Sequence, residues 1–570
     1  MAPRWIGFVG ALALAAFGPA GMGDAQAAAL PASVTPTAAP AEWPMLPAVP
    51  PLRTQTLVHL DWHGSLRTRA ESLGGVRINA DNALLPVHLD VRHGAADKAS
   101  EVPGGRMSSA DVRLRLEPLI QLGDSAKVGM QLDAMGLLGD NAAVMTAETR
   151  FGTGEFGNNP LKGGLMVRRA WASLRVLGLA NVAIGRMADH FGLGMVRNQG
   201  GEFDQDYQSD VDRVLVTGEL MGFRLALGRA NLASLPLASE GGALANYNAA
   251  VAAQQGTSNG VPDTLGAGNS GMPLQDSADV IRWDVAVGGG KLVADRGLLW
   301  DAALLWQSQD FGLRGESTQT PGGPSPRAQL SDPSCGVDCA MLTQRGLRLY
   351  TFQAALDWHT VWGGFPLRLQ AESALEYGTI ARSDITIAAD AKTILAGGAA
   401  LRAKWQRPAT DWLLDVGVAT GEADGGFGVN DTTNFKMGGV SDGAARAFLT
   451  GFRFHRSYRV DGLLFRDLIG AVANTLYVRP AWRWPMWQAK GQVCTLELGL
   501  LGAVAASADA TPGLGRWIGV EPDATLRLQR GQAHAFARAT VVLPGAALAN
   551  PGGAAADPAW RVDAGWKVAF

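Results

Sequence analysis

The densest group of ionisable side chains lies in residues 185–213, GRMADHFGLGMVRNQGGEFDQDYQSDVDR. Charged side chains beside a pore can select solutes by the sign of their charge. Clustered carboxylates can also bind Ca²⁺, although the spacing here does not match an EF-hand loop. Three interpretations therefore stay open. They are a solvated external loop with internal ion pairs, a pore constriction or ligand contact, and a metal site. The candidate residues are Arg186, Asp189, His190, Arg197, Glu202, Asp204, Asp206, Asp210, Asp212 and Arg213.

A second polar set is spaced two residues apart. In TLVHLDWHGSL, His59, Asp61 and His63 alternate with apolar residues, so on a strand they share one face at a spacing of ~6.8 Å. A zinc ion needs its ligands to converge, which one strand rarely allows. The spacing therefore favours an ordinary polar lumen face over a zinc site.

Arginines continue this polar face on other segments. Several inward arginines would favour anionic solutes, and inward carboxylates such as Glu372 would reduce that preference. The candidate lumen arginines are Arg113, Arg115, Arg169, Arg175, Arg368 and Arg479.

Catalysis and cofactor binding have little support. Nothing in the sequence places serine and histidine side chains together, and no cofactor motif is visible, so we expect no enzyme activity. The Gly/Asp-rich segment TGEADGGFGVNDTTNF (420–435) predicts a flexible surface loop, with Ca²⁺ ligation as the alternative.

Segments with alternating apolar and polar residues recur along the chain. Strict alternation predicts a strand with one apolar face, and ~10 residues suffice for a tilted strand to cross a bilayer. Tryptophans near the ends of such segments predict aromatic girdles at the membrane interfaces. The clearest segments are residues 56–66, 111–122, 297–307 and 365–378. The girdle candidates are Trp62, Trp300, Trp306, Trp358, Trp412, Trp566 and Trp171, whose register also allows an inward position.

The links between these segments alternate in length. Short links on one side and long loops on the other are typical of an outer-membrane barrel. We therefore predict an antiparallel transmembrane β-barrel of about 18 strands (16 to 20), with the short turns and both chain ends in the periplasm. The short links are residues 123–126, 177–180, 218–222, 361–364 and 407–410. The long ones fall near 68–110, 137–163, 188–212, 231–278, 309–345 and 420–472.

The last segment, WRVDAGWKVAF, alternates to its final residue. A barrel pairs its last strand with its first, so no edge remains. Trp566, Val568 and Phe570 resemble the C-terminal assembly signal of bacterial outer-membrane barrels, which implies recognition by the barrel-insertion machinery.

The N-terminal residues predict export. Arg4, an apolar run and Ala25-Gln26-Ala27 indicate a cleaved signal peptide (1–27), followed by a Pro/Ala-rich periplasmic linker (28–53) and the barrel (54–570). Charged residues make up 18% of the chain and its net charge is −3, which disfavours nucleic-acid binding. Cys335 and Cys339 predict a small loop disulfide in an exported protein.

Three longer segments resemble an uncharacterised family of exported barrel proteins from Gram-negative bacteria, from about residue 54 to the end. They are residues 113–135, 185–213 and 463–482. GRMADHFGLG and TGEADGGFGVNDTTNF are also similar to segments of alginate-export porins. That resemblance implies 18 strands, an Arg-rich lumen and Arg186 as a pore residue. The carboxylates after Arg186 depart from a lumen suited to a polyanion.

These observations predict an outer-membrane channel for passive passage of a small polar or anionic solute. Its partners would be the bilayer, the assembly machinery and that solute, and the sequence leaves the oligomeric state open. The alternative is a plugged, non-conducting barrel whose long loops act in surface interaction or adhesion.

Overall fold

The structure is a computed structural model. It describes residues 58–78, 87–89, 106–123, 125–137, 166–176, 178–233, 280–293, 296–313, 342–381, 391–422, 448–489, 491–549 and 555–570. The predicted signal peptide, the linker, the Cys335–Cys339 pair and most of loop 420–435 lie outside these residues and stay predictions.

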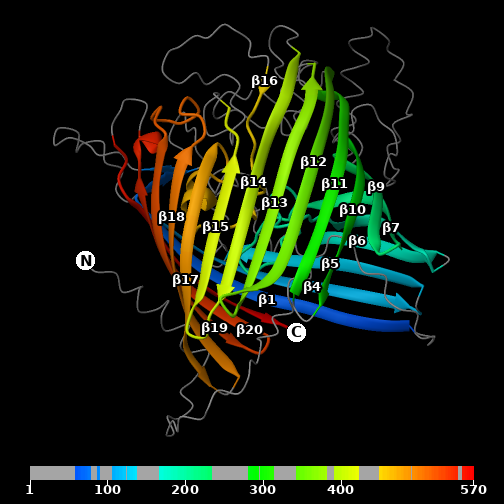
Figure 1. Cartoon of the computed structure of the whole chain (residues 1–570), viewed down its shortest axis with the longest axis horizontal. Coiled ribbons are helices and arrows are strands. Elements are labelled where there is room, and N and C mark those ends of the chain that lie inside the picture. The colour runs from blue at the N-terminus through cyan, green and yellow to red at the C-terminus, as the bar shows by residue number, and fades with distance from the viewer. Residues whose placement is uncertain are drawn as a thin grey trace, which may run out of the picture.

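Eighteen strands of 9 to 21 residues form a closed ring within the described part of the chain (Figure 1). Each pairs antiparallel with both neighbours, and β1 closes the ring by pairing with both β4 and β21. In ring order they are β1 (Val58–Gly74), β4 (Arg106–Leu122), β5 (Ala126–Leu137), β6 (Met166–Val176), β7 (Ala180–Ala188), β8 (Asp210–Leu220), β9 (Phe223–Ala233), β10 (Val280–Val293), β11 (Arg296–Leu313), β12 (Leu342–Trp362), β13 (Phe365–Ile380), β14 (Lys392–Gln406), β15 (Asp411–Ala419), β17 (Thr475–Ala489), β18 (Gln492–Ala505), β19 (Trp517–Arg530), β20 (Ala533–Pro544) and β21 (Ala559–Ala569). The predicted strand number is confirmed.

Five short elements complete the described part of the fold. They are β2 (Val76–Ile78), β3 (Val87–Leu89), β16 (Phe448–Leu449), the π-helix η7 (Leu464–Leu468) and the 3₁₀ helix η8 (Ala546–Leu548). None of the helices among the described residues is long and apolar enough to cross a membrane.

The two faces of the strands differ as the alternation predicts. On β21, Val562 and Val568 are 43% and 36% exposed on the outer face, whereas Arg561 and Asp563 are buried inside. A closed ring satisfies every backbone hydrogen bond along its strands, which is what a lipid environment requires. An apolar exterior around a polar interior is therefore the architecture of a transmembrane β-barrel.

Link length segregates by end, as predicted. All five predicted short links are turns at one end of the barrel, where β1 also begins and β21 ends. We call this the turn end and the opposite end the loop end. Residues 445–472 add no wall strand, because their described part holds only β16 and η7.

Aromatic rings gather on the outer face near the turn end. Trp362, Trp405, Trp412 and Trp482 form a chain of neighbouring rings with centroids 5.0 to 6.5 Å apart. The guanidinium of Arg407 lies 4.7 Å from the Trp405 ring centroid. Such rings suit the boundary between lipid tails and headgroups.

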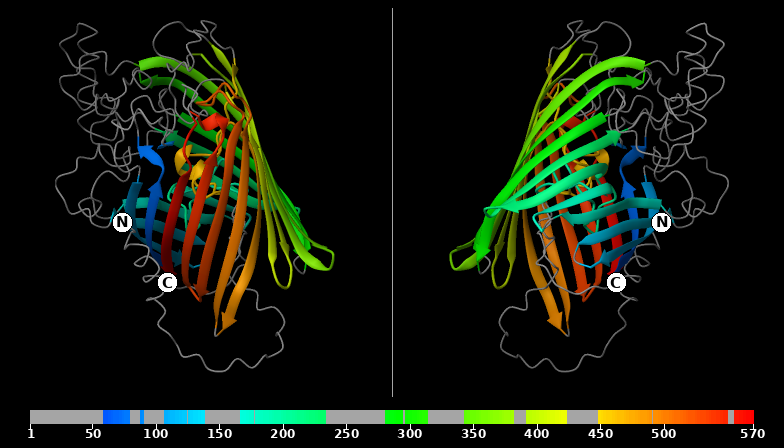
Figure 2. Two further views of the ribbon diagram at one scale, coloured as in Figure 1. Left: turned by 90° about the vertical axis from the view of Figure 1, so that its left-hand side faces the viewer. Right: turned by 90° about the vertical axis from the view of Figure 1, so that its right-hand side faces the viewer.

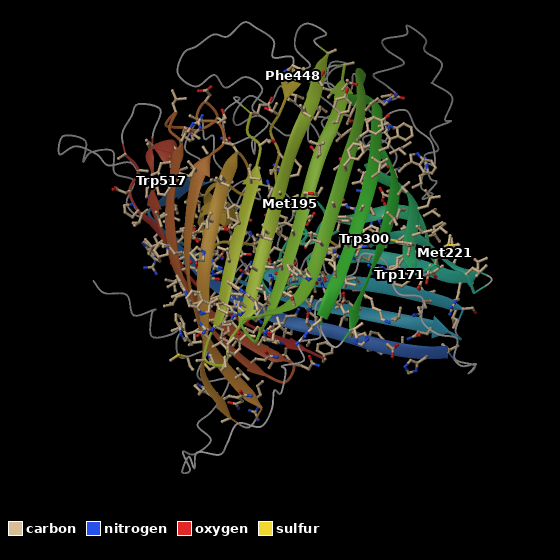
Figure 3. All side chains as sticks on the ribbon, in the orientation of Figure 1. Trp171, Met195, Met221, Trp300, Phe448 and Trp517 are labelled. Atoms are coloured by element: carbon tan, nitrogen blue, oxygen red, sulfur yellow. The ribbon has the colours of Figure 1, made fainter. Side chains whose placement is uncertain are left out.

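Six of the seven predicted girdle tryptophans share this outer face. Trp171 is the exception, since it faces inward and its ring covers Gly129. Figure 3 labels Trp171 and Trp300, which lie on β6 and β11 with four strands of the ring between them.

Gly64 marks the point where the ring closes. Its backbone exchanges two hydrogen bonds with Phe570, of 2.9 and 3.0 Å, and the Phe570 ring covers the space that a Cβ would need. Aromatic cover of a strand glycine is a recurring stabilising pair. A larger residue at this position would meet the ring and the Arg115 carbonyl oxygen.

We therefore expect Gly64→Val to destabilise the closed barrel by about 1–3 kcal/mol, the usual cost of overpacking. The measurement is the fraction of heat-modifiable folded barrel on electrophoresis after refolding. Gly502→Val is the matched control, because a Cβ at that strand glycine meets open space. Equal folded fractions for the two variants would contradict the expectation.

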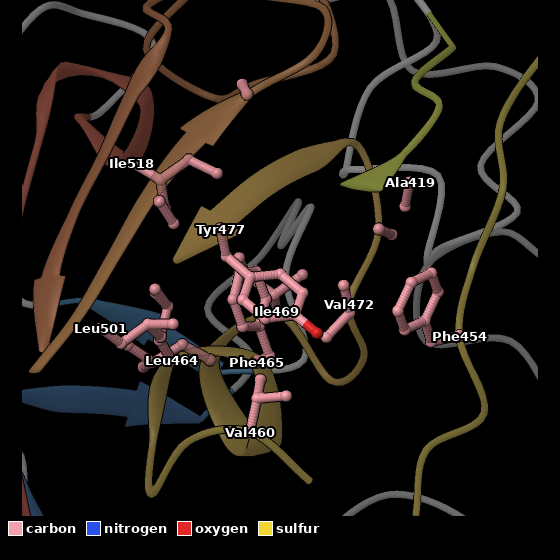
Figure 4. Close-up of a cluster of buried hydrophobic side chains, with 14 of the residues drawn as sticks. Ala419, Phe454, Val460, Leu464, Phe465, Ile469, Val472, Tyr477, Leu501 and Ile518 are labelled. Atoms are coloured by element: carbon pink, nitrogen blue, oxygen red, sulfur yellow. The ribbon is translucent and has the colours of Figure 1, made fainter. Parts of the chain in front are cut away.

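The hydrophobic core lies inside the ring, where loops from the loop end fold inward. Figure 2 shows the gold-coloured chain between β16 and β17 enclosed by the strands in both views. Its side chains Leu464, Phe465 and Ile469 pack against Tyr477 of β17, and Figure 4 shows this cluster with residues of β18 and β19.

Candidate functional site in the barrel lumen

The first infolded segment, residues 189–209, joins β7 to β8 and crosses the lumen. Its tip reaches β13, where the Met195 backbone N–H donates to Glu372 Oε2 at 3.0 Å. On the other side, the Gln205 carbonyl oxygen accepts a 3.0 Å hydrogen bond from Arg113 of β4. Met195 is fully buried, and Figure 3 places it in the middle of the barrel.

Asp189 fixes the base of this segment. Its carboxylate accepts hydrogen bonds from Arg197 at 2.9 Å, Arg213 at 3.2 Å and Arg282 of β10 at 2.7 Å. Burial by itself would raise the pKa of Asp189, but the three guanidinium groups outweigh burial and hold it well below its ordinary value. Asp189 therefore ties the segment to the wall and is not a free solute ligand.

The second infolded segment, residues 450–474, enters from nearly the opposite wall. It lies between β15 and β17, six ring strands from β7–β8 in one direction and eight in the other. The backbone N–H groups of Gly462 and Leu464 each donate to the Glu521 carboxylate of β19 at 2.7 Å. Asp467 forms an ion pair with Arg561 of β21. Wall carboxylates and arginines thus hold both segments in place.

The two segments meet in mid-lumen. The His455 N–H donates to the Met195 carbonyl oxygen at 2.6 Å, and the Gln205 side-chain amide donates to the Ser457 carbonyl oxygen at 2.9 Å. Ser457 Oγ also accepts from the Tyr207 N–H at 3.2 Å. We call the two joined segments the partition.

Asp204 belongs to the first infolded segment and connects it to the second segment and to the barrel wall. It pairs with Arg466 of the second segment, with Arg538 of β20 at 2.8 Å and with Arg69 of β1 at 3.2 Å. Burial opposes ionisation, but these three arginines outweigh it and hold the pKa of Asp204 far below its ordinary value. Asp206 is fixed in the same way by Arg67 and Arg69, both at 2.8 Å.

The two partition histidines are uncharged at neutral pH. Burial lowers the pKa of both His190 and His455 to about 4. His190 bonds within its own segment, to the Gly192 carbonyl oxygen at 3.1 Å. Neither histidine therefore contributes positive charge to the lumen.

On the lumen wall, a row of basic side chains crosses four adjacent strands. The strand register aligns His534 of β20, Lys567 of β21, Arg67 of β1 and Arg113 of β4. Arg67 pairs with Asp111 and Asp206. Within the described residues, Arg113 and Lys567 form no ion pair with a carboxylate. We call these four residues the basic row.

A cavity of about 380 Å³ lies beneath the partition on its turn-end side. Gln199 and Gly201 of the first infolded segment line it on one side, and Lys567 of the basic row lines it on another. Further lining residues are His63, Arg115, Glu117, Arg169 and Gln532. This volume falls in the range of small-ligand sites, roughly 300–1,000 Å³.

The other predicted site residues take several positions. Arg115, Arg169 and Arg368 face the lumen, paired with Asp133, Asp210 and Asp357 respectively. His59 pairs with Asp61 at 2.7 Å at the turn end, and His63 lines the cavity. Within the described residues, no group of three or more His, Cys, Asp or Glu side chains could hold a metal ion. Ca²⁺ in loop 420–435 stays a prediction.

The structure corrects the prediction that Arg186 lines the pore. It lies on the same strand face as Ile184, which is 53% exposed, and its cross-strand partner Asp212 shares a face with the exposed Val214. The two charged groups pair at 2.7 Å on the outer wall near the loop end. The alternation of β7 and β8 therefore places Arg186 and Asp212 outside the lumen.

Several lumen residues were not among the sequence-based candidates. Arg67 and Arg69 continue the strict alternation of their segment, which by itself places both side chains on its polar, lumen-facing side. Lys567 and Glu117 also lie on faces predicted to be polar. The second infolded segment has no such signal, because its contacts join residues as far apart as Asp204 and Arg466.

No protein-family model matches the chain, and a search of curated proteins finds no match. Similar solved structures include Pseudomonas aeruginosa OccK11 (OpdR), at 12% identity and TM-score 0.44, covering 89% of this chain and 96% of that one. Pseudomonas aeruginosa OpdK with vanillate is 10% identical, TM-score 0.44, covering 90% and 99%. Pseudomonas putida OprB is 8% identical, TM-score 0.38, covering 90% and 94%. The resemblances to an uncharacterised exported family and to alginate-export porins stay predictions.

Proposed function

We propose that the chain is a bacterial outer-membrane channel that passes small anionic solutes passively. An 18-stranded ring without infolded loops leaves a wide aqueous channel. The partition narrows that path in mid-lumen, at the level of the basic row. A narrow charged passage selects small solutes by size and by sign of charge. The proposal includes no enzymatic reaction.

The basic row carries this proposal. Most lumen arginines are neutralised by a neighbouring carboxylate, such as Arg115 by Asp133 at 2.7 Å. Arg113 and Lys567 are not, and they face the same stretch of lumen from β4 and β21, the two strands that flank β1. Fixed cations in a passage of low dielectric attract anions and repel cations.

Conductance of the purified, refolded protein in a planar bilayer tests the proposal. We expect stable single-channel steps and, under a salt gradient, a reversal potential that shows preference for the anion. A cation preference would contradict the assigned charge selectivity. A folded barrel without any steps would contradict the channel itself.

The second candidate is a plugged barrel that acts in surface interaction. The seam between the infolded segments favours it, because hydrogen bonds such as that from His455 to Met195 join the two segments across the lumen. This candidate requires a folded barrel without conductance and a binding partner that is lost when loops 234–279 or 314–341 are deleted.

Membrane insertion follows from the same proposal. We infer export by the predicted signal peptide and insertion by the barrel-assembly machinery, which would recognise Trp566, Val568 and Phe570. Val568 and Phe570 are exposed on the outer face of β21, in keeping with such recognition.

A further inference from the structure

The cavity beneath the partition has the position of a solute-binding site. It lies between the first infolded segment, represented by Gln199, and the turn-end strands β1, β4 and β21. In the proposed channel, we expect a solute that passes the partition to enter this space. Its lining is mainly polar, so its charge arrangement decides which solute it holds.

Two lining charges have no opposite charge of their own. Arg115 and Arg169 are paired with Asp133 and Asp210 at 2.7 and 2.6 Å. Within the described residues, Lys567 has no ion pair with a carboxylate. Glu117 has none with a cation, and its carboxylate accepts only a hydrogen bond from the Gln131 amide.

Lys567 and Glu117 are held apart by the fold. Lys567 lies on β21 and Glu117 on β4, and β1 runs between these strands. Neighbouring strands are ~4.8 Å apart, so the two backbones are separated by ~10 Å across the sheet. Lys567 is also level with Arg67 of β1 whereas Glu117 is level with His63, which adds an offset of four residues, ~13 Å along the strands. The two charges do not reach ion-pairing distance, and a molecule between them can contact both.

We propose that this cavity binds a small zwitterion that carries both a carboxylate and an ammonium group, such as an α-amino acid. The Lys567 ammonium binds the carboxylate, and the Glu117 carboxylate binds the ammonium. Such charge-assisted hydrogen bonds are stronger than neutral ones. The inference rests on the proposed channel function and names its substrate class. A simple anion uses Lys567 alone and leaves Glu117 unpaired.

Calorimetry on the refolded full chain in detergent tests this pairing with three probes of similar size. L-alanine carries both groups, propionate lacks the ammonium, and ethylammonium lacks the carboxylate. We expect L-alanine to bind at least about tenfold more tightly than either single-charge probe, since the second ion pair adds to the first. Equal affinity for propionate and L-alanine would overturn the proposal in favour of a simple anion site.

Variants separate the two contacts. Glu117→Gln should weaken L-alanine binding to the level of propionate and leave propionate unchanged, whereas Lys567→Met should weaken both. Glu219→Gln and Lys291→Met are matched controls, because both side chains are exposed near the turn end and outside the cavity. Unchanged L-alanine binding in Glu117→Gln, with the barrel folded, would overturn the proposal.

Conductance of the same proteins keeps this inference separate from the channel proposal. Anion-selective steps without any preference for L-alanine would overturn the zwitterion site and keep the channel. Tight, Glu117-dependent binding of L-alanine to a silent barrel would support the site and contradict the channel.

Discussion

Replacing Asp204 with alanine is expected to open the partition. The single-channel conductance should rise several-fold, and the infolded segments should become accessible to protease. Asp204 joins both infolded segments to the wall through Arg466, Arg538 and Arg69. Breaking a buried ion pair costs up to about 3–5 kcal/mol. We expect the lower end of this range, because Arg69 keeps Asp206 and Arg538 keeps Asp563. The second infolded segment would then lose the contact between Arg466 and Asp204 that joins it to the first.

Cleavage by trypsin detects the same opening of the partition at known peptide bonds. The second infolded segment carries Arg453, Arg456 and Arg459, and its backbone is held in the lumen by Glu521 and by the first segment. Cleavage requires local opening, so its rate follows the free energy of that opening. We expect mass spectrometry to find cuts after these arginines in Asp204→Ala and far fewer in the wild type.

Acid should reproduce the effect in the wild type, but only at low pH. The folded-state pKa of Asp204 is far below the unfolded value of about 3.9, so its contribution to stability is complete above that value. The contribution is lost as the pH falls through the folded pKa. The partition should therefore stay closed at pH 5 and loosen only in strongly acidic solution.

Glu202→Ala is the matched control for Asp204→Ala. It removes one negative charge from the same infolded segment, but Glu202 is exposed and no ion pair joins it to another described residue. Its conductance and cleavage pattern should match the wild type. An Asp204→Ala channel with unchanged conductance and protection would show that other contacts close the lumen without Asp204.

The wall of the barrel was predictable because its physics is local. On a strand, each residue faces lipid or lumen according to parity, so apolar positions such as Val562 define the outer face directly. The same parity places Arg113, Arg115 and Arg368 inside. The same alternation indicates that Arg186 lies outside, because it is two residues from Ile184 and therefore on the same face of the strand.

The partition was less predictable because its contacts are long-range. Its residues mix apolar side chains that pack inside the ring, such as Phe454 and Phe465, with charges matched to distant strands. Neither a period of two nor a helical period describes such a segment. The 189–209 charges were recognised as candidates, but their ion-pair partners appear only when the ring is closed.

Charge reversal at Lys567 should have the largest effect on ion selectivity. Lys567→Glu changes the charge of the basic row by two units at a position beside Arg67 and Arg113. The new carboxylate would pair with these arginines and neutralise the row. We expect the reversal potential under a salt gradient to move from anion preference toward cation preference.

A graded series separates electrostatics from a change in pore width. Lys567→Met removes one charge at similar side-chain size, so its reversal potential should fall between those of the wild type and Lys567→Glu. Lys291→Glu makes the same charge change at the exposed end of β10 and should leave selectivity unchanged. The differences should shrink at high salt, because the Debye length falls to about 3 Å at 1 M. If all four proteins share one reversal potential, the basic row does not set selectivity, and the unpaired charge of Lys567 acts only within the cavity.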